Sequence, residues 1–118
     1  GFLSRWKTQY TGWRDLFNVI KGMIYHIAIY SDWEGQKYNT AFKPPSYEEE
    51  GFIHCCSRDQ LNGVIERYYP NSDNLILLHI DDSRLNMPVK YEKSTNDELF
   101  PHVFGPINKE SIVRVEPY

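Results

Sequence analysis

The sequence predicts a small α+β domain of five or six short strands and two or three helices, preceded by a separate amphipathic helix. Its length of 118 residues suits a single hydrophobic core. Short apolar runs of strand length alternate with segments whose apolar residues recur every three or four positions, which indicates strands and helices in turn. Gly and Pro mark the turns between them.

The first 22 residues differ in character from the rest of the chain. Apolar side chains from Phe2 to Ile20 recur at spacings of three and four, and Gly22 is a natural helix stop. We therefore expect a helical extension over 1–22 and a domain over 23–118. The extension is a helix docked on the domain or on a second copy, an expression or fusion remnant, or a basic helix for a membrane surface or partner. The first reading allows a homo-oligomer formed through 1–22.

The strands of the domain follow from apolar runs bounded by turn residues. The run 75–80 is continuously apolar, which is typical of a central strand. The other expected strands lie at 23–29, 52–56, 88–92, 99–104 and 112–115.

Helices are expected where a capping residue precedes an apolar stripe. Ser31-Asp32 suits a short helix over 33–37, and Ser46 with Glu49 suggests a helical turn that Gly51 closes. Ser57 and Gln60 fit a capping box for a helix over 58–69. The expected buried stripe of that helix consists of Leu61, Val64, Ile65 and Tyr68.

Composition restricts the class of protein. The two cysteines, Cys55 and Cys56, are adjacent and cannot form a disulfide framework, so we expect a reducing, cytoplasmic setting. No apolar run approaches the roughly 20 residues of a membrane span, so no membrane partner is expected of the domain. A net charge of −3 gives no strong nucleic-acid signal.

The chemistry concentrates at the corner 51–60, where a strand ends and a helix begins. In a strand of period two, Phe52, His54 and Cys56 share one face. The first amides of the following helix would point back past His54, an arrangement that suits an anion. His54 is therefore the first candidate catalytic residue, with a structural hydrogen bond at the corner as the alternative.

The motifs from Met23 onward resemble the domain-of-unknown-function family 952. They comprise Ile24-Tyr25-His26, Trp33, Pro45-Ser46, Glu50-Gly51-Phe52-Ile53-His54, Gln60, Leu77-Leu78, Ile80-Asp81, Leu85, Tyr91-Glu92 and Leu99 to Pro106. The match spans 23–116. The family resembles the ADP-ribosyltransferase superfold, near the RNA 2′-phosphotransferases, which implies a split, mixed β-sheet with a nucleotide-sized cleft. Cys56 stands where members usually carry a hydroxyl residue, and Tyr91 stands where they often carry Trp.

The resemblance implies NAD or a related phosphorylated nucleotide as cofactor or ligand, and roles for further residues. By the superfold's pattern, His26 would hold a ribose hydroxyl, with a core histidine as the alternative. His102 interrupts an apolar stretch and needs a partner if buried. Glu92 is the best-placed carboxylate to stabilise positive charge on a ribose carbon, and a surface salt bridge is equally compatible with it. Glu48–Glu50 are interpreted as a solvated helix face.

These residues make up the predicted site. The catalytic candidates are His54, His102 and Glu92, and the cofactor-binding candidates are His26, Ser57 and Gln60. His79 lies outside the matched motifs and is interpreted as structural.

Two other readings concern Cys56. It is a thiolate nucleophile if the helix end and an imidazole lower its pKa, or a small buried hydrophobe, which we favour. With the three histidines it also supplies zinc ligands, but no tight ligand spacing supports a metal. The predicted function is nucleotide binding with transfer of ADP-ribose. The alternative is a non-catalytic module that binds a nucleotide or a protein.

Overall fold

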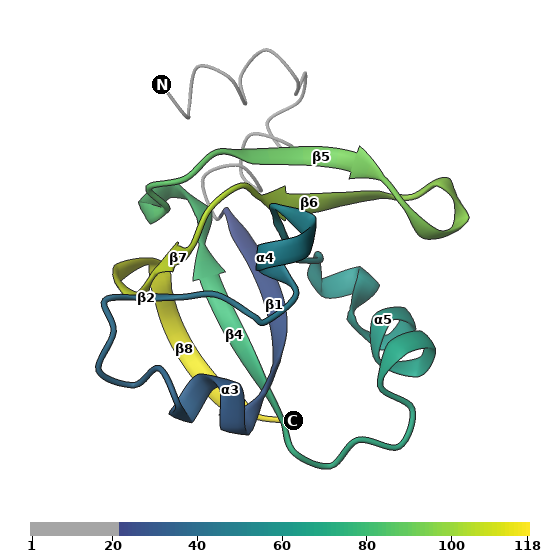
Figure 1. Cartoon of the computed structure of the whole chain (residues 1–118). Coiled ribbons are helices and arrows are strands. Elements are labelled where there is room, and N and C mark those ends of the chain that lie inside the picture. Colours follow the sequence, from purple (N-terminus) through teal and green to yellow (C-terminus); the bar gives the residue numbers. More distant parts are fainter. Residues whose placement is uncertain (1–21) are drawn as a thin grey trace.

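The computed structural model describes residues 22–118, which form a mixed α and β domain (Figure 1). The eight strands of this part of the chain are β1 (Met23–Ile29), β2 (Ala41–Phe42), β3 (Ile53–His54), β4 (Leu75–Asp81), β5 (Val89–Lys93), β6 (Leu99–Val103), β7 (Ile107–Asn108) and β8 (Ile112–Pro117). The α-helices are α3 (Tyr30–Glu34), α4 (Tyr47–Glu50) and α5 (Leu61–Tyr68). The 3₁₀ turns are η1 (Arg58–Gln60), η2 (Asp82–Arg84), η3 (Thr95–Asp97) and η4 (Lys109–Ser111).

The predicted central strand is confirmed. β4 lies between β1 and β8 in a three-stranded antiparallel sheet, in a register that runs from Met23 opposite Asp81 to Ile29 opposite Leu75. Six consecutive residues of β4 are buried, because both faces of this sheet are covered. The pairing of β4 with β8 shifts between His79 and Ile80.

The second layer contains the order β3-β6-β5 and the small pair β2-β7. The segment after β3 joins this layer to the first: Cys55 N–H donates to the Pro101 carbonyl at 3.0 Å, and Tyr25 and Cys56 exchange two backbone hydrogen bonds of 2.8 Å. The strands are therefore split into separate sheets, as predicted. The prediction of a mixed sheet is wrong, since every pairing among the described strands is antiparallel.

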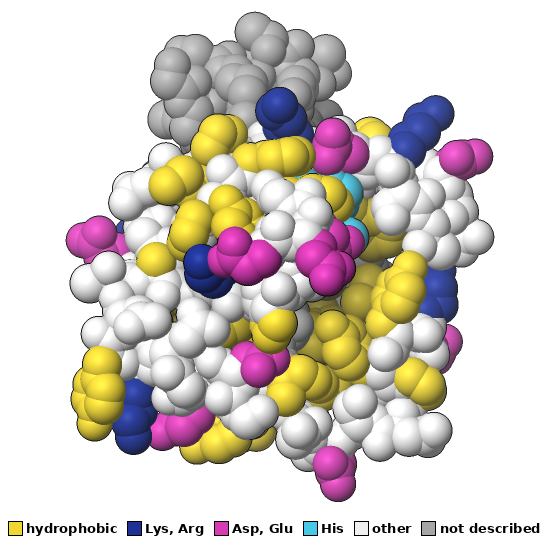
Figure 2. All heavy atoms as spheres, in the orientation of Figure 1, with side chains coloured by type: hydrophobic (Ala, Val, Ile, Leu, Met, Phe, Trp, Pro, Cys, Tyr) yellow, Lys and Arg dark blue, Asp and Glu magenta, His cyan; other side chains and the backbone are white. Residues whose placement is uncertain are grey.

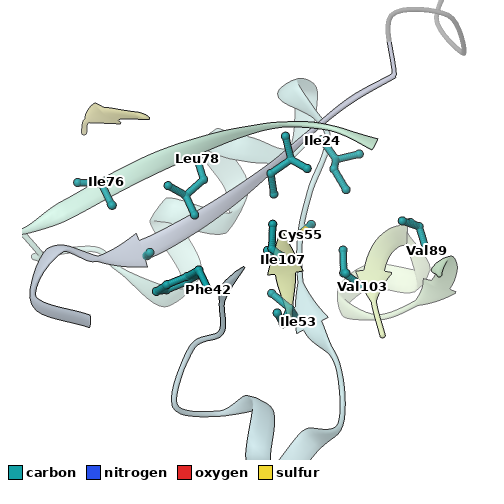
Figure 3. Close-up of a cluster of buried hydrophobic side chains, with 11 residues drawn as sticks. Ile24, Phe42, Ile53, Cys55, Ile76, Leu78, Val89, Val103 and Ile107 are labelled. Carbon is teal, nitrogen blue, oxygen red and sulfur yellow. The ribbon is translucent and has the colours of Figure 1, made fainter. Parts of the chain in front are cut away.

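Two buried clusters hold the layers together, one on each face of the central sheet. Figure 3 shows the larger cluster, in which Ile24, Ile76 and Leu78 of the central sheet meet side chains from the second layer. The smaller cluster, on the opposite face, includes Ile27, Leu77 and Leu61 of α5. The alternation along β1 and β4 follows the period of two that the sequence predicts.

The helices agree with their capping signals, with local differences. The backbone N–H of Ser57 donates to the side-chain oxygen of Gln60 at 3.0 Å, so the predicted capping interaction is present and η1 leads into α5. Gly51 ends α4 with a φ of 77°. Tyr68 is 58% exposed, so its placement in the buried stripe is wrong. α5 packs on the smaller cluster, where Leu61 is buried and Val64 and Ile65 are partly buried, in agreement with the rest of the predicted stripe.

The predicted helix over 1–22, and the oligomer that it was expected to form, lie outside the described residues apart from Gly22. Within the described part of the chain, no helix has both the length and the apolar character needed to cross a membrane.

Candidate functional site

The corner at 53–56 brings three of the four histidines together. His54 is the register partner of His102 on β6, and the centroids of their rings lie 5.1 Å apart at 78°. The carbonyl of His54 lies 2.7 Å from Nδ1 of His26 on β1. Residues distant in sequence therefore meet where the two sheets separate.

His26 is a buried, neutral imidazole. Its Nδ1–H donates to the His54 carbonyl, so the neutral ring presents an acceptor at Nε2. That Nε2 atom is buried and has no hydrogen-bond partner in the described structure. Burial lowers the pKa of His26 from 6.5 to about 4, although the backbone hydrogen bond acts in the opposite direction. The residue therefore accepts a hydrogen bond at neutral pH.

His54 forms a hydrogen bond with Glu50 that the sequence did not predict. Its Nε2 lies 3.0 Å from Oε2 of Glu50, because the left-handed turn at Gly51 folds the end of α4 back over β3. The hydrogen bond from His54 lowers the pKa of Glu50 below its usual value. The interpretation of Glu50 as part of a solvated helix face is therefore incomplete. Its place in the Glu50-to-His54 motif, rather than beside Glu48 and Glu49, was the signal for this role.

His102 and Glu92 form a second pair beside the first. His102 Nδ1 lies 2.8 Å from Oε1 of Glu92 on the neighbouring strand β5, and its Nε2 is buried without a hydrogen-bond partner in residues 22–118. The ring of Phe52 stacks on His102 with centroids 4.3 Å apart at 22°. His102 thus has the partner that its burial requires.

A cavity of about 620 Å³ opens next to this corner, within the usual size range of small-ligand sites. Figure 2 shows a hollow with hydrophobic walls on this face, with histidine and acidic side chains at its upper edge. Apolar and aromatic lining residues include Ile27, Val64 and Phe100, and polar ones include His26, His54 and Glu50. His102 and Glu92 do not line it.

Ser57 and Gln60, two of the predicted cofactor-binding residues, also lie outside the lining. The carboxamide of Gln60 is used at both ends: its oxygen accepts the Ser57 N–H, and its nitrogen donates to the Leu99 carbonyl at 2.9 Å. These contacts join the start of η1 to β6. They give Gln60 a structural role in the described molecule.

The thiols are buried, which matches the interpretation of Cys56 as a small hydrophobe. Burial raises the pKa of Cys56 to about 12 and that of Cys55 well above its usual value. His79 Nε2–H donates to Oε1 of Glu116 on β8 at 2.7 Å. In residues 22–118, no group of three or more His, Cys, Asp or Glu side chains is placed to hold a metal ion.

The fold and cavity define the chain as a small α+β domain with separate antiparallel sheets and one corner where polar side chains meet a ligand-sized cavity. The chain belongs to the DUF952 family, described as proteins of unknown function, whose family model matches residues 27–115. This confirms the resemblance at the level of the family.

Two solved structures of protein CC0527 from Caulobacter crescentus are similar in fold. The crystal structure has 25% sequence identity and a TM-score of 0.74, with 80% of this chain and 84% of that chain covered. The solution NMR structure has 25% identity and a TM-score of 0.70, with 81% and 84% covered. A search of the curated proteins gives no match.

Proposed function

We propose that the cavity binds the nucleoside end of a small ligand, whose ribose hydroxyl donates a hydrogen bond to His26 Nε2. The unpartnered acceptor is the observation that supports this most directly. His26 lines the cavity, is 5% exposed, and has no partner at Nε2 in the described residues. Such an atom is costly to bury unless a ligand or water satisfies it. A hydroxyl donor matches the fixed tautomer.

NAD is the first candidate ligand, and cleavage of its nicotinamide is the candidate reaction. In hydrolysis, the bond between ribose C1 and the nicotinamide nitrogen breaks, and its electron pair leaves with nicotinamide. The oxygen of a water molecule bonds to C1, and its proton passes to His54 Nδ1, the ring nitrogen opposite the one bonded to Glu50. Transfer of ADP-ribose replaces the water with an acceptor hydroxyl.

Glu50 takes the role that the sequence analysis proposed for Glu92. Positive charge develops on the ribose carbon as the bond breaks, and a carboxylate next to it stabilises that charge. Glu50 lines the cavity and contacts His54, whereas Glu92 contacts His102 and does not line the cavity. His102 then acts on His54 through ring contact, as a positioning residue.

The second candidate function is a non-catalytic module that binds a nucleoside-like ligand. It is favoured by the charge of the lining, in which the described residues contribute no Lys or Arg. Enzymes that transfer or hold phosphoryl groups generally place cations on them. Turnover separates the two functions: nicotinamide release above a His54→Ala control supports the enzyme, and binding without release supports the module.

Titration calorimetry with nicotinamide riboside and NAD tests the proposal. We expect His26→Ala to abolish binding and His26→Gln, which keeps an acceptor oxygen, to retain part of it. His79→Gln is the matched control, because His79 is also a buried histidine of the central sheet but does not line the cavity. Failure of both ligands to bind, or equal affinity in the wild type and His26→Ala, would refute it.

A further inference from the structure

We infer that the cavity selects a positively charged ligand and keeps phosphate groups out of its interior. This inference rests on the proposed function and names the class of ligand more narrowly. For NAD it means that the cationic nicotinamide riboside end enters and the pyrophosphate stays at the opening. The same charge preference would apply to any N-linked riboside with a cationic ring.

The first support is the sign of the charges on the lining. Asp32 in the first turn of α3 and Glu50 at the end of α4 both line the cavity, from two separate elements. No Lys or Arg of residues 22–118 joins them there. A cation is attracted by such a site, whereas a phosphate dianion is repelled and loses its hydration without compensation.

Basic residues near the cavity are engaged elsewhere. Lys43 pairs with Glu48 of α4, which does not line the cavity. The guanidinium of Arg58 lies near the ring of Tyr25 and donates to its hydroxyl at 3.5 Å. Arg67 likewise lies 6.0 Å from the ring centroid of the lining residue Tyr68. Arg58 and Arg67 are therefore the cations of the described residues where a ligand phosphate would be expected if phosphate is not kept out.

The second support is the aromatic part of the lining. Tyr68 and Tyr69 from the end of α5 and Phe100 from β6 line the cavity. The Tyr68 hydroxyl is fixed by a 2.6 Å hydrogen bond to the Thr95 hydroxyl. The faces of aromatic rings attract cations, and a flat cationic heterocycle also stacks on them.

The third support is the buried acceptor at His26. A cluster of carboxylates alone does not define a ligand site, but here it shares a cavity with an imidazole that is 5% exposed and unpartnered at Nε2 in the described structure. In this arrangement Nε2 of His26 accepts a hydrogen bond from a ligand hydroxyl, and the carboxylates of Asp32 and Glu50 attract the positive charge of the same ligand. One ligand with both features satisfies all of these groups.

The test compares ligands of nearly equal shape and different charge by titration calorimetry on the full chain. Nicotinamide riboside carries one positive charge, its reduced dihydro form is neutral, and nicotinamide mononucleotide adds a phosphate. We expect the cation to bind at least about tenfold more tightly than the reduced form. The added phosphate should give no gain, and Arg58→Ala should leave all three affinities unchanged.

A carboxylate variant completes the test. Glu50→Gln should lower the ratio of the cation's affinity to that of the reduced form by about threefold or more. Glu49→Gln, which changes an exposed neighbouring carboxylate outside the lining, should leave the ratio unchanged. Equal affinities for the three ligands, or tighter binding of the mononucleotide that Arg58→Ala removes, would overturn the charge selection and leave the riboside site intact. Absence of binding by all three would overturn both proposals.

Discussion

Lowering the pH should destabilise the domain through His26. The pKa of this residue is about 4 in the folded protein and 6.5 ordinarily, so between these values the unfolded chain binds a proton that the native state does not. Stability is therefore fully present above pH 6.5 and falls as the pH drops towards 4. The difference corresponds to about 3 kcal/mol in total, of which about 2 kcal/mol is lost between pH 7.5 and 5.0.

Urea unfolding at pH 7.5 and pH 5.0 measures this loss. All ionisable groups other than His26 are common to both proteins, so their effects cancel when the wild type is compared with His26→Gln. The variant should lose about 2 kcal/mol less than the wild type over this pH interval. An equal loss refutes the reasoning. If the variant does not fold, NMR titration of the wild-type ring decides the question, because a midpoint near 6.5 contradicts the buried, neutral imidazole.

Three further predictions concern packing and reactivity. Leu78→Ala, at a fully buried position of β4, should lower the free energy of unfolding in urea by about 2–5 kcal/mol. Val113→Ala, at a position 49% exposed, should lower it by less than about 1 kcal/mol, and equal losses would contradict the placement of the core. Gln60→Ala should cost about 1–2 kcal/mol by the same measurement, since both ends of the side chain bond to backbone, and an unchanged midpoint would argue against its structural role. Cys55 and Cys56 should react with an aromatic disulfide reagent much more slowly in the native protein than in urea, because burial raises both pKa values, and fast native reaction would show them to be accessible.

The local structure of this chain could be predicted well because its signals are local. The apolar run of β4, the capping pair Ser57 and Gln60, and the left-handed stop at Gly51 each depend on a few neighbouring residues. The pairing of the strands could be predicted less well from the sequence. That Tyr25 pairs with Cys56, and that all described pairings are antiparallel, depends on contacts between distant segments that no sequence period specifies.

The candidate site, too, could be predicted from the sequence only in part. His26, His54 and His102 were predicted together and do meet, since the motifs that contain them could be recognised in the sequence. The choice of carboxylate could not be made in the same way. Glu50 contacts His54 because the turn at Gly51 reverses the chain. Glu92 contacts His102 because β5 pairs with β6 in a register that brings these two side chains together.

The hydrogen bond from His26 to the His54 carbonyl would link stability to the proposed ligand binding. It joins the two sheets next to the pair formed by Tyr25 and Cys56, and it leaves Nε2 as the buried acceptor of a residue that lines the cavity. Protonation of Nε2 therefore removes the acceptor and charges a buried ring in the same step. A riboside bound at Nε2 should lower the pKa of His26 further, because it binds only the neutral form. Folding should therefore weaken as the pH falls from 6.5 towards 4, whereas the affinity, which follows the fraction of neutral His26 in the folded protein, should fall only as the pH approaches 4.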